Sequence, residues 1–275
     1  MKKSLIVGIA MGLILQVPVN AYAASPIAVS SINSIIEKDA PAIPTESGYA
    51  VTQINIRENP SKESAIIGGY KKGDKITILS TEGEWAKTDR GYIWGGYIAK
   101  NYNYDFDLQS DSENASKYMG YVYDIMNELD AEYAAILQGY EIHVCDNPDT
   151  DILNKAPDHV TSPFQVINGV TYLSNRDGGV QLMYLRAEKK SLKETIYHEL
   201  AHAIDYKDFR MLSDNQIVTQ SKEQEGPLLK EKYDLKSIVD NDEYFAEAFR
   251  IKMQDPDGLQ KTAPMISEFF NSLTL

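Results

Sequence analysis

Residues 197–205 read YHELAHAID and contain two of the four histidines of the chain. His198 and His202 are four positions apart, so on a helix they share one face, with β-carbons about 5–6 Å apart. Two imidazoles at that spacing can bind one zinc ion, at zinc–nitrogen distances of about 2.0–2.1 Å. Glu199 points around the side of such a helix, where it can act on a water molecule. This pattern predicts a helix that carries a zinc site.

A capping pattern precedes the two histidines. Ser191 and Glu194 have the spacing of a capping box, which predicts a helix from Leu192 to about Tyr206. The alternative is an ordinary amphipathic helix that happens to carry two histidines. A zinc ion needs more than two ligands, so a third ligand elsewhere in the chain decides between the two interpretations.

Residues 240–253, DNDEYFAEAFRIKM, supply a candidate for this third ligand. The segment starts with N-cap residues and is apolar around most of its circumference, which predicts a buried helix. Glu243, Glu247 and Arg250 interrupt the apolar surface as one charged stripe at i, i+4 and i+7. Buried carboxylates are costly unless they are paired or bind a metal. The stripe therefore complements the two histidines, the alternative being a solvated face with a Glu–Arg pair.

The first 23 residues predict a secretory signal peptide. They comprise two lysines, an apolar run of about eleven residues and the A-x-A site Ala21–Ala23, after which we expect cleavage. The run is too short to span a bilayer, which needs about 20 residues. Cleavage removes two lysines and moves the formal net charge from −13 to −15. We therefore expect an exported protein, secreted or associated with the cell wall, with no nucleic-acid or membrane partner. Cys145 is the only cysteine, which excludes an internal disulfide.

Two segments of different composition follow the signal peptide. Residues 24–46 form a spacer rich in Ser, Ala, Ile and Pro, and residues 47–104 consist of short alternating segments separated by turn residues. Such a pattern predicts a small all-β barrel. The segment also resembles the bacterial SH3-like domains, and the matching stretches are NIR (55–57), KGD (72–74), ITIL (76–79), GEWAK (83–87) and GYIW (91–94). This resemblance implies binding to cell-wall peptidoglycan, or a role as a spacer.

The rest of the chain predicts an α+β domain. Residues 105–115 read as a linker, and residues 116–275 as the second domain, which begins with a helix at about 116–137 and a strand at 140–146. Asn168-Gly169 predicts a hairpin turn. Strands near 164–167, 170–174 and 180–186 are then expected to form a meander. The whole chain is predicted to be a multidomain protein.

A second resemblance covers roughly residues 120–275. HELAH, followed by EYFAEAFR and KTAPMISEFFNSL, resembles the catalytic domain of the anthrax lethal factor family, which includes secreted endopeptidases that cut between two prolines. The resemblance implies that Glu243 binds zinc and that Glu247 supports the site. The family also has a tyrosine helper seven residues before the glutamate ligand. That position is Lys236 here, so Tyr233 is the nearest candidate for this role.

Together these patterns predict a zincin-type metallopeptidase with one zinc ion per chain, bound by His198, His202 and Glu243. Glu199 is the predicted general base, Tyr233 a helper for the oxyanion, and a protein or peptide the substrate. The substrate is expected to add as a strand to an edge near Gly178 to Leu185. The alternatives are a wall-binding module with a structural zinc ion, a peptidoglycan hydrolase and a host-directed toxin. The Cys/His type of wall hydrolase is disfavoured, because Cys145 sits in a strand and lacks an activating helix N-terminus.

Overall fold

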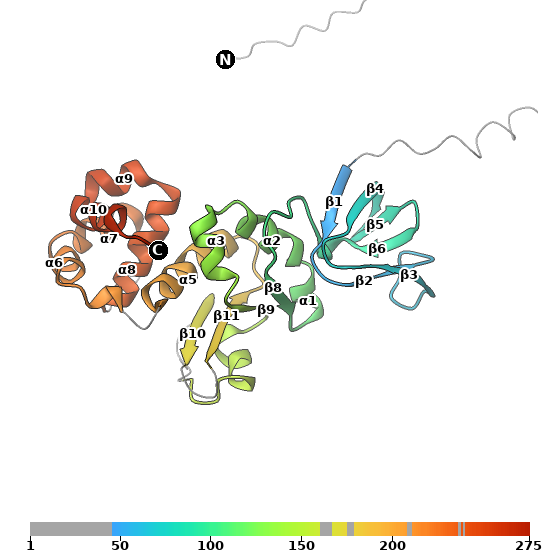
Figure 1. Cartoon of the computed structure of the whole chain (residues 1–275), viewed down its shortest axis with the longest axis horizontal. Coiled ribbons are helices and arrows are strands. Elements are labelled where there is room, and N and C mark those ends of the chain that lie inside the picture. The colour runs from blue at the N-terminus through green and yellow to red at the C-terminus, as the bar shows by residue number, and fades with distance from the viewer. Residues whose placement is uncertain (1–45, 160–166, 175–178, 208–210, 236–237, 239) are drawn as a thin grey trace, which may run out of the picture. The chain divides into compact units, whose positions relative to one another are not determined.

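The computed structural model describes residues 46–159, 167–174, 179–207, 211–235, 238 and 240–275 (Figure 1). The predicted signal peptide and all of the predicted spacer except residue 46 lie outside the described residues. Within the described ranges, no helix is both long enough and apolar enough to cross a membrane.

The amino-terminal part is an all-β domain, as the sequence predicts. Its seven strands pair in the order β3-β2-β6-β5-β4-β1-β7. They are β1 (Glu46–Ala50), β2 (Ile54–Arg57), β3 (Ile66–Tyr70), β4 (Lys75–Glu82), β5 (Trp85–Thr88), β6 (Gly91–Trp94) and β7 (Ile98–Ala99), with the 3₁₀ turn η1 (Gly95–Tyr97) between the last two. Alternate residues such as Ile54, Ile56, Ile76 and Ile78 point inward and form a buried core.

The second sheet has four strands in the order β10-β11-β9-β8. They are β8 (Asp107–Ser110), β9 (Glu141–Cys145), β10 (Gly169–Ser174) and β11 (Val180–Arg186). β8 and β11 are both parallel to β9, and β10 is antiparallel to β11.

Two predictions for this region need correction. Residues 107–110, assigned to a linker, form a strand of the sheet because they pair with β9. Of the predicted meander, the antiparallel pairing of β10 with β11 is present, and β11 also pairs in parallel with β9. Gly169 is not a hairpin turn but the first residue of β10, where it pairs with Leu185. Most of the predicted strand at 164–167 lies outside the described residues.

Helices make up most of the remaining domain. They are α1 (Glu113–Ser116), α2 (Met119–Asn127), α3 (Ala131–Leu137), α4 (Pro148–Asp151), α5 (Leu192–Asp205), α6 (Gln216–Gln224), α7 (Gly226–Tyr233), α8 (Asn241–Gln254), α9 (Pro256–Thr262) and α10 (Pro264–Ser272), with 3₁₀ turns η2 (Ile152–Asn154) and η5 (Leu212–Asp214). The single helix predicted over 116–137 is divided among α1, α2 and α3. Neither break contains a glycine or a proline, so local sequence signals did not locate them.

Helices α5 and α8 lie against each other and position the candidate site. α5 also contacts α2, α3 and the strands β10 and β11. It starts at Leu192 as predicted, but the Ser191 side chain does not cap it, because the Ser191 hydroxyl donates to the Glu188 carbonyl instead. α8 begins as predicted, since the Asp240 side chain accepts a hydrogen bond from the backbone N–H of Glu243.

Candidate metal centre

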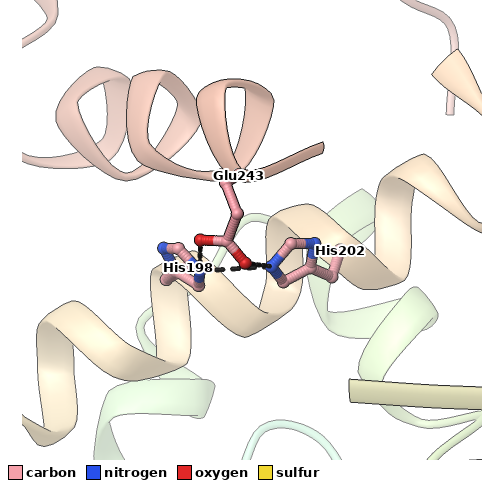
Figure 2. A group of neighbouring side chains, drawn as sticks. All are labelled: His198, His202 and Glu243. Atoms are coloured by element: carbon pink, nitrogen blue, oxygen red, sulfur yellow. Dashed lines mark hydrogen bonds and ion pairs between the residues drawn. The ribbon is translucent and has the colours of Figure 1, made fainter. Parts of the chain in front are cut away.

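Three side chains from α5 and α8 meet at one point (Figure 2). The Nε2 atoms of His198 and His202 are 3.1 Å apart. One Glu243 oxygen, Oε2, lies 3.5 Å from Nε2 of His198, and the other, Oε1, lies 3.7 Å from Nε2 of His202. The two histidines are adjacent because they are one turn apart on α5, and Glu243 faces them from the first turn of α8.

The donor set of this cluster suits a zinc ion. Two imidazole nitrogens and one carboxylate, with a further position left for water or substrate, are typical of catalytic zinc sites. The ligand atoms of His198, His202 and Glu243 all lie within 4.8 Å of one another, so small side-chain movements bring all three to a common ion. The arrangement of the three residues fits one such ion.

Burial and neighbouring charges shift the pKa values of the two histidines in opposite directions. Burial alone would lower the pKa of His198, but contacts with Glu247, Glu199 and Glu243 outweigh burial and raise it to about 9. Burial, together with the neighbouring His198, lowers the pKa of His202 to about 3. A divalent cation at this point would balance the surrounding carboxylates.

Glu199 lies beside the cluster and is nearly buried, with 4% of its surface exposed. Burial raises the pKa of its carboxyl to about 7. A general base works best when its pKa is close to the working pH, and a burial-induced shift of this kind is common in catalytic carboxylates.

Glu247 lies behind His198, on the side away from Glu243. Its Oε1 is 3.4 Å from Nδ1 of His198. Its Oε2 accepts a hydrogen bond from Nε of Arg250 at 2.9 Å and forms an ion pair with Nη2 at 2.7 Å. Burial would raise the pKa of Glu247, but His198 and Arg250 lower it. Glu247 is thus placed to orient the His198 ring while Arg250 holds the carboxylate. From the sequence, a Glu–Arg pair was expected only in the alternative interpretation, a solvated face.

Tyr233 is not brought to the cluster. Its hydroxyl donates to Asp255 Oδ2 at 2.9 Å, beyond the end of α8 opposite to Glu243. The twelve residues from Glu243 to Asp255 correspond to about 18 Å along a helix axis. The helper role predicted for Tyr233 finds no support in this arrangement. Lys236 lies outside the described residues.

Two site residues were missed from the sequence. Tyr206, one turn after His202, lies over its ring with 5.8 Å between centroids and 26° between planes. Thr171 of β10 hydrogen-bonds to Glu199. The i, i+4 spacing could have identified Tyr206, whereas no local signal marks Thr171, because it reaches the site through the tertiary fold.

Cys145 is a buried packing residue. It is fully buried, and its Sγ contacts the Leu185 carbonyl oxygen at 3.6 Å. Burial raises the pKa of its thiol, so it is a poor nucleophile. The nearby His143 is already bonded to Asp111 and Glu141 on its two ring nitrogens.

Two family models match separate parts of the chain. Residues 52–102 match the family model of the bacterial SH3 domain, and residues 178–273 match the model described as the anthrax toxin lethal factor N- and C-terminal domain. The solved structure of the Pro-Pro endopeptidase PPEP-2 from Paenibacillus alvei is similar with a TM-score of 0.42 and 16% identity, covering 61% of this chain and 97% of that one. No curated protein matches the chain significantly. The chain therefore joins a bacterial SH3-like domain to an anthrax lethal factor-like domain.

Proposed function

We propose that this protein is a secreted, zinc-dependent endopeptidase. The convergence of His198, His202 and Glu243 beside the buried Glu199 carries the proposal. The match of residues 178–273 to the lethal factor family model supports it, because that match includes both helices that supply the cluster.

Each residue has a role in this proposal. His198, His202 and Glu243 hold one zinc ion, and Glu247 orients the His198 ring. A zinc ion bound there supplies a Lewis acid for peptide hydrolysis. Glu199 accepts a proton from the attacking water and later donates it to the leaving amine. The raised pKa of Glu199 suits both steps, since the group can exist in either protonation state near neutral pH.

The peptide substrate is proposed to bind along β10 as an added strand. The segment predicted for this purpose, near Gly178 to Leu185, corresponds mainly to β11, which already pairs with β10 and β9. In the described part of the chain, β10 has a strand neighbour on one side only. β10 also contacts α5, the helix that carries Glu199. An extended peptide on this edge would lie beside the metal centre and gain main-chain hydrogen bonds.

The test is hydrolysis of a peptide library and of protein substrates by the mature protein, with bound zinc measured by atomic absorption. We expect one zinc ion per chain. Glu199→Ala should keep the zinc and lose activity by about 10²–10⁴-fold, the usual contribution of a general base. Glu194→Ala is the matched control, because Glu194 is an exposed glutamate on the same helix. Zinc binding without cleavage of any substrate would favour a structural metal and a binding module.

We further propose that the SH3-like domain attaches the enzyme to the bacterial cell wall. Support comes from the match of residues 52–102 to the bacterial SH3 domain model. Cosedimentation of the full mature chain with purified peptidoglycan tests this proposal. Release of soluble wall fragments in the same experiment would instead indicate a peptidoglycan hydrolase, and recovery of the protein in the supernatant would contradict wall attachment.

A further inference from the structure

The inner face of β10 lies directly against the Glu199 carboxylate. Side chains alternate along a strand, so Gly169 and Thr171 share one face of β10. Both contact Glu199. Val170 and Tyr172 belong to the other face, where they pack on the small apolar cluster that includes Cys145. The edge strand proposed to receive the peptide therefore also touches the proposed general base.

Gly169 provides room for the carboxylate. A β-carbon at this position would lie 2.4 Å from Oε1 of Glu199 and 2.6 Å from its Cγ, distances that real contacts do not reach. The backbone of Gly169 does not adopt a positive φ, so no turn conformation requires glycine here. The close approach of β10 to Glu199 is the reason for this glycine.

Thr171 provides the hydrogen bond. Its hydroxyl lies 2.8 Å from Oε2 of Glu199 and 3.1 Å from the Glu199 carbonyl oxygen. No second side chain in the described ranges donates to this carboxylate. A buried carboxylate without a donor is costly, so this single hydroxyl determines where the group rests.

We propose that Thr171 is a positioning residue that sets the orientation of Glu199, in a space that Gly169 leaves open. This inference rests on the proposed function of Glu199 as the general base. It also connects substrate binding to the base, because a peptide that pairs with the open edge of β10 fixes the backbone from which Thr171 projects. Thr171 acts through Glu199 and does not itself react.

Three variants of the full mature chain separate the hydroxyl from the shape of the side chain. Thr171→Val keeps the shape and removes the donor, Thr171→Ser keeps the donor, and Gly169→Ala fills the space. Tyr172→Phe is the matched control, because it removes a hydroxyl that donates to Asp158 from the opposite face of the same strand. Circular dichroism and zinc content establish that each variant is folded and loaded.

The first readout is independent of activity. Crystal structures of the zinc-loaded wild type, Thr171→Val and Tyr172→Phe are compared for the Glu199 rotamer. We expect Glu199 to leave its position in Thr171→Val and to keep it in Tyr172→Phe. An unchanged Glu199 in Thr171→Val would overturn the proposal, even for a protein that cleaves no tested peptide. Inactivity of the wild type on all substrates would instead count against the proposed function.

The second readout is kinetic. Loss of one hydrogen bond to a charged group should lower kcat of Thr171→Val by about tenfold or more, with KM and zinc stoichiometry unchanged. Thr171→Ser should restore kcat to within about threefold of wild type, because the donor is retained. A lower kcat in Gly169→Ala would agree with displacement of Glu199. Equal losses in Thr171→Ser and Thr171→Val would show a packing role and overturn the proposal.

Discussion

Glu247 lies behind His198, one of the proposed zinc ligands. Its carboxylate lies between His198 Nδ1 and the Arg250 guanidinium, so it holds one ring in a fixed orientation. Partners of this kind typically change metal affinity by about 10–100-fold when they are mutated. Glu247 is therefore placed to support the proposed zinc site without binding the ion.

Glu247→Gln is expected to weaken zinc binding by about 10-fold or more, because the amide is a weaker acceptor for the ring N–H than a carboxylate. Competition with a chromogenic chelator measures the affinity. Glu268→Gln, an exposed position on α10, is the control. Equal zinc affinities for wild type and Glu247→Gln would contradict this role.

Single residues also show where sequence patterns mislead. Asn168-Gly169 has the composition of a hairpin turn, yet Gly169 is needed because Glu199 lies against its Cα. Tyr233 was the nearest tyrosine in the sequence, yet its hydroxyl faces Asp255. In both cases the decisive neighbour is more than 20 residues away, beyond the reach of local sequence patterns.

At the scale of elements, Glu225 joins α6, α8 and α10. It follows α6, and its buried carboxylate accepts hydrogen bonds from the backbone N–H groups of Met265 and Ile266 at 2.9 and 3.3 Å. It also accepts from the Ser221 hydroxyl, which contacts the hydroxyl of Tyr244 on α8 at 2.6 Å. The N-cap residue of α10 makes no side-chain capping hydrogen bond. The distant Glu225 side chain instead accepts hydrogen bonds from backbone N–H groups in the first turn of α10.

Glu225→Ala is expected to lower the free energy of unfolding by about 1–3 kcal/mol, because two backbone donors and one hydroxyl lose their buried acceptor. Urea denaturation of the zinc-loaded protein measures the change. Glu223→Ala, an exposed glutamate two residues earlier, should change stability by less than about 0.5 kcal/mol. Similar effects of the two substitutions would refute the capping role.

Elements with strong local signals were predicted well from the sequence. α5 was expected over Leu192 to about Tyr206 and spans Leu192–Asp205, and α8 spans Asn241–Gln254 against a predicted 240–253. The two histidines and Glu243 were predicted to meet and do so. Strand β8 and the parallel pairing of β9 with β11 were not predicted, because they depend on contacts between distant segments.

At the scale of the whole molecule, the protein contains a second buried histidine system, far in sequence from the proposed metal ligands. His143 on β9 is 4% exposed and stacks on Tyr184 of β11, with 4.4 Å between ring centroids. Its two ring nitrogens lie 2.7 Å from Asp111 and 2.8 Å from Glu141. Lys155 also pairs with Glu141. A protonated His143 would donate to both carboxylates and link β9 to the chain segment that follows β8.

This arrangement makes the stability of the protein depend on pH. Burial would lower the pKa of His143, but Asp111 and Glu141 outweigh it and raise the pKa above its usual value of about 6.5. A raised histidine pKa means that the folded state binds the proton more tightly than the unfolded state. The resulting stabilisation is complete below about pH 6.5 and is lost as the pH rises through the folded-state pKa.

We expect the difference in unfolding free energy between wild type and His143→Gln to shrink as the pH is raised from about 6 to 9, since only the wild type loses a proton from this position. Urea denaturation measures this difference in unfolding free energy. Zinc is kept at saturating concentration, so that His198 and His202 stay bound to the ion. Asp111→Asn should move the loss of this stabilisation to lower pH, because one of the two partners of His143 becomes neutral. Asp107→Asn, at an exposed position on β8, should not. A difference that stays constant with pH would mean that His143 is neutral in the folded protein, and that Asp111 and Glu141 hold it by ordinary hydrogen bonds alone.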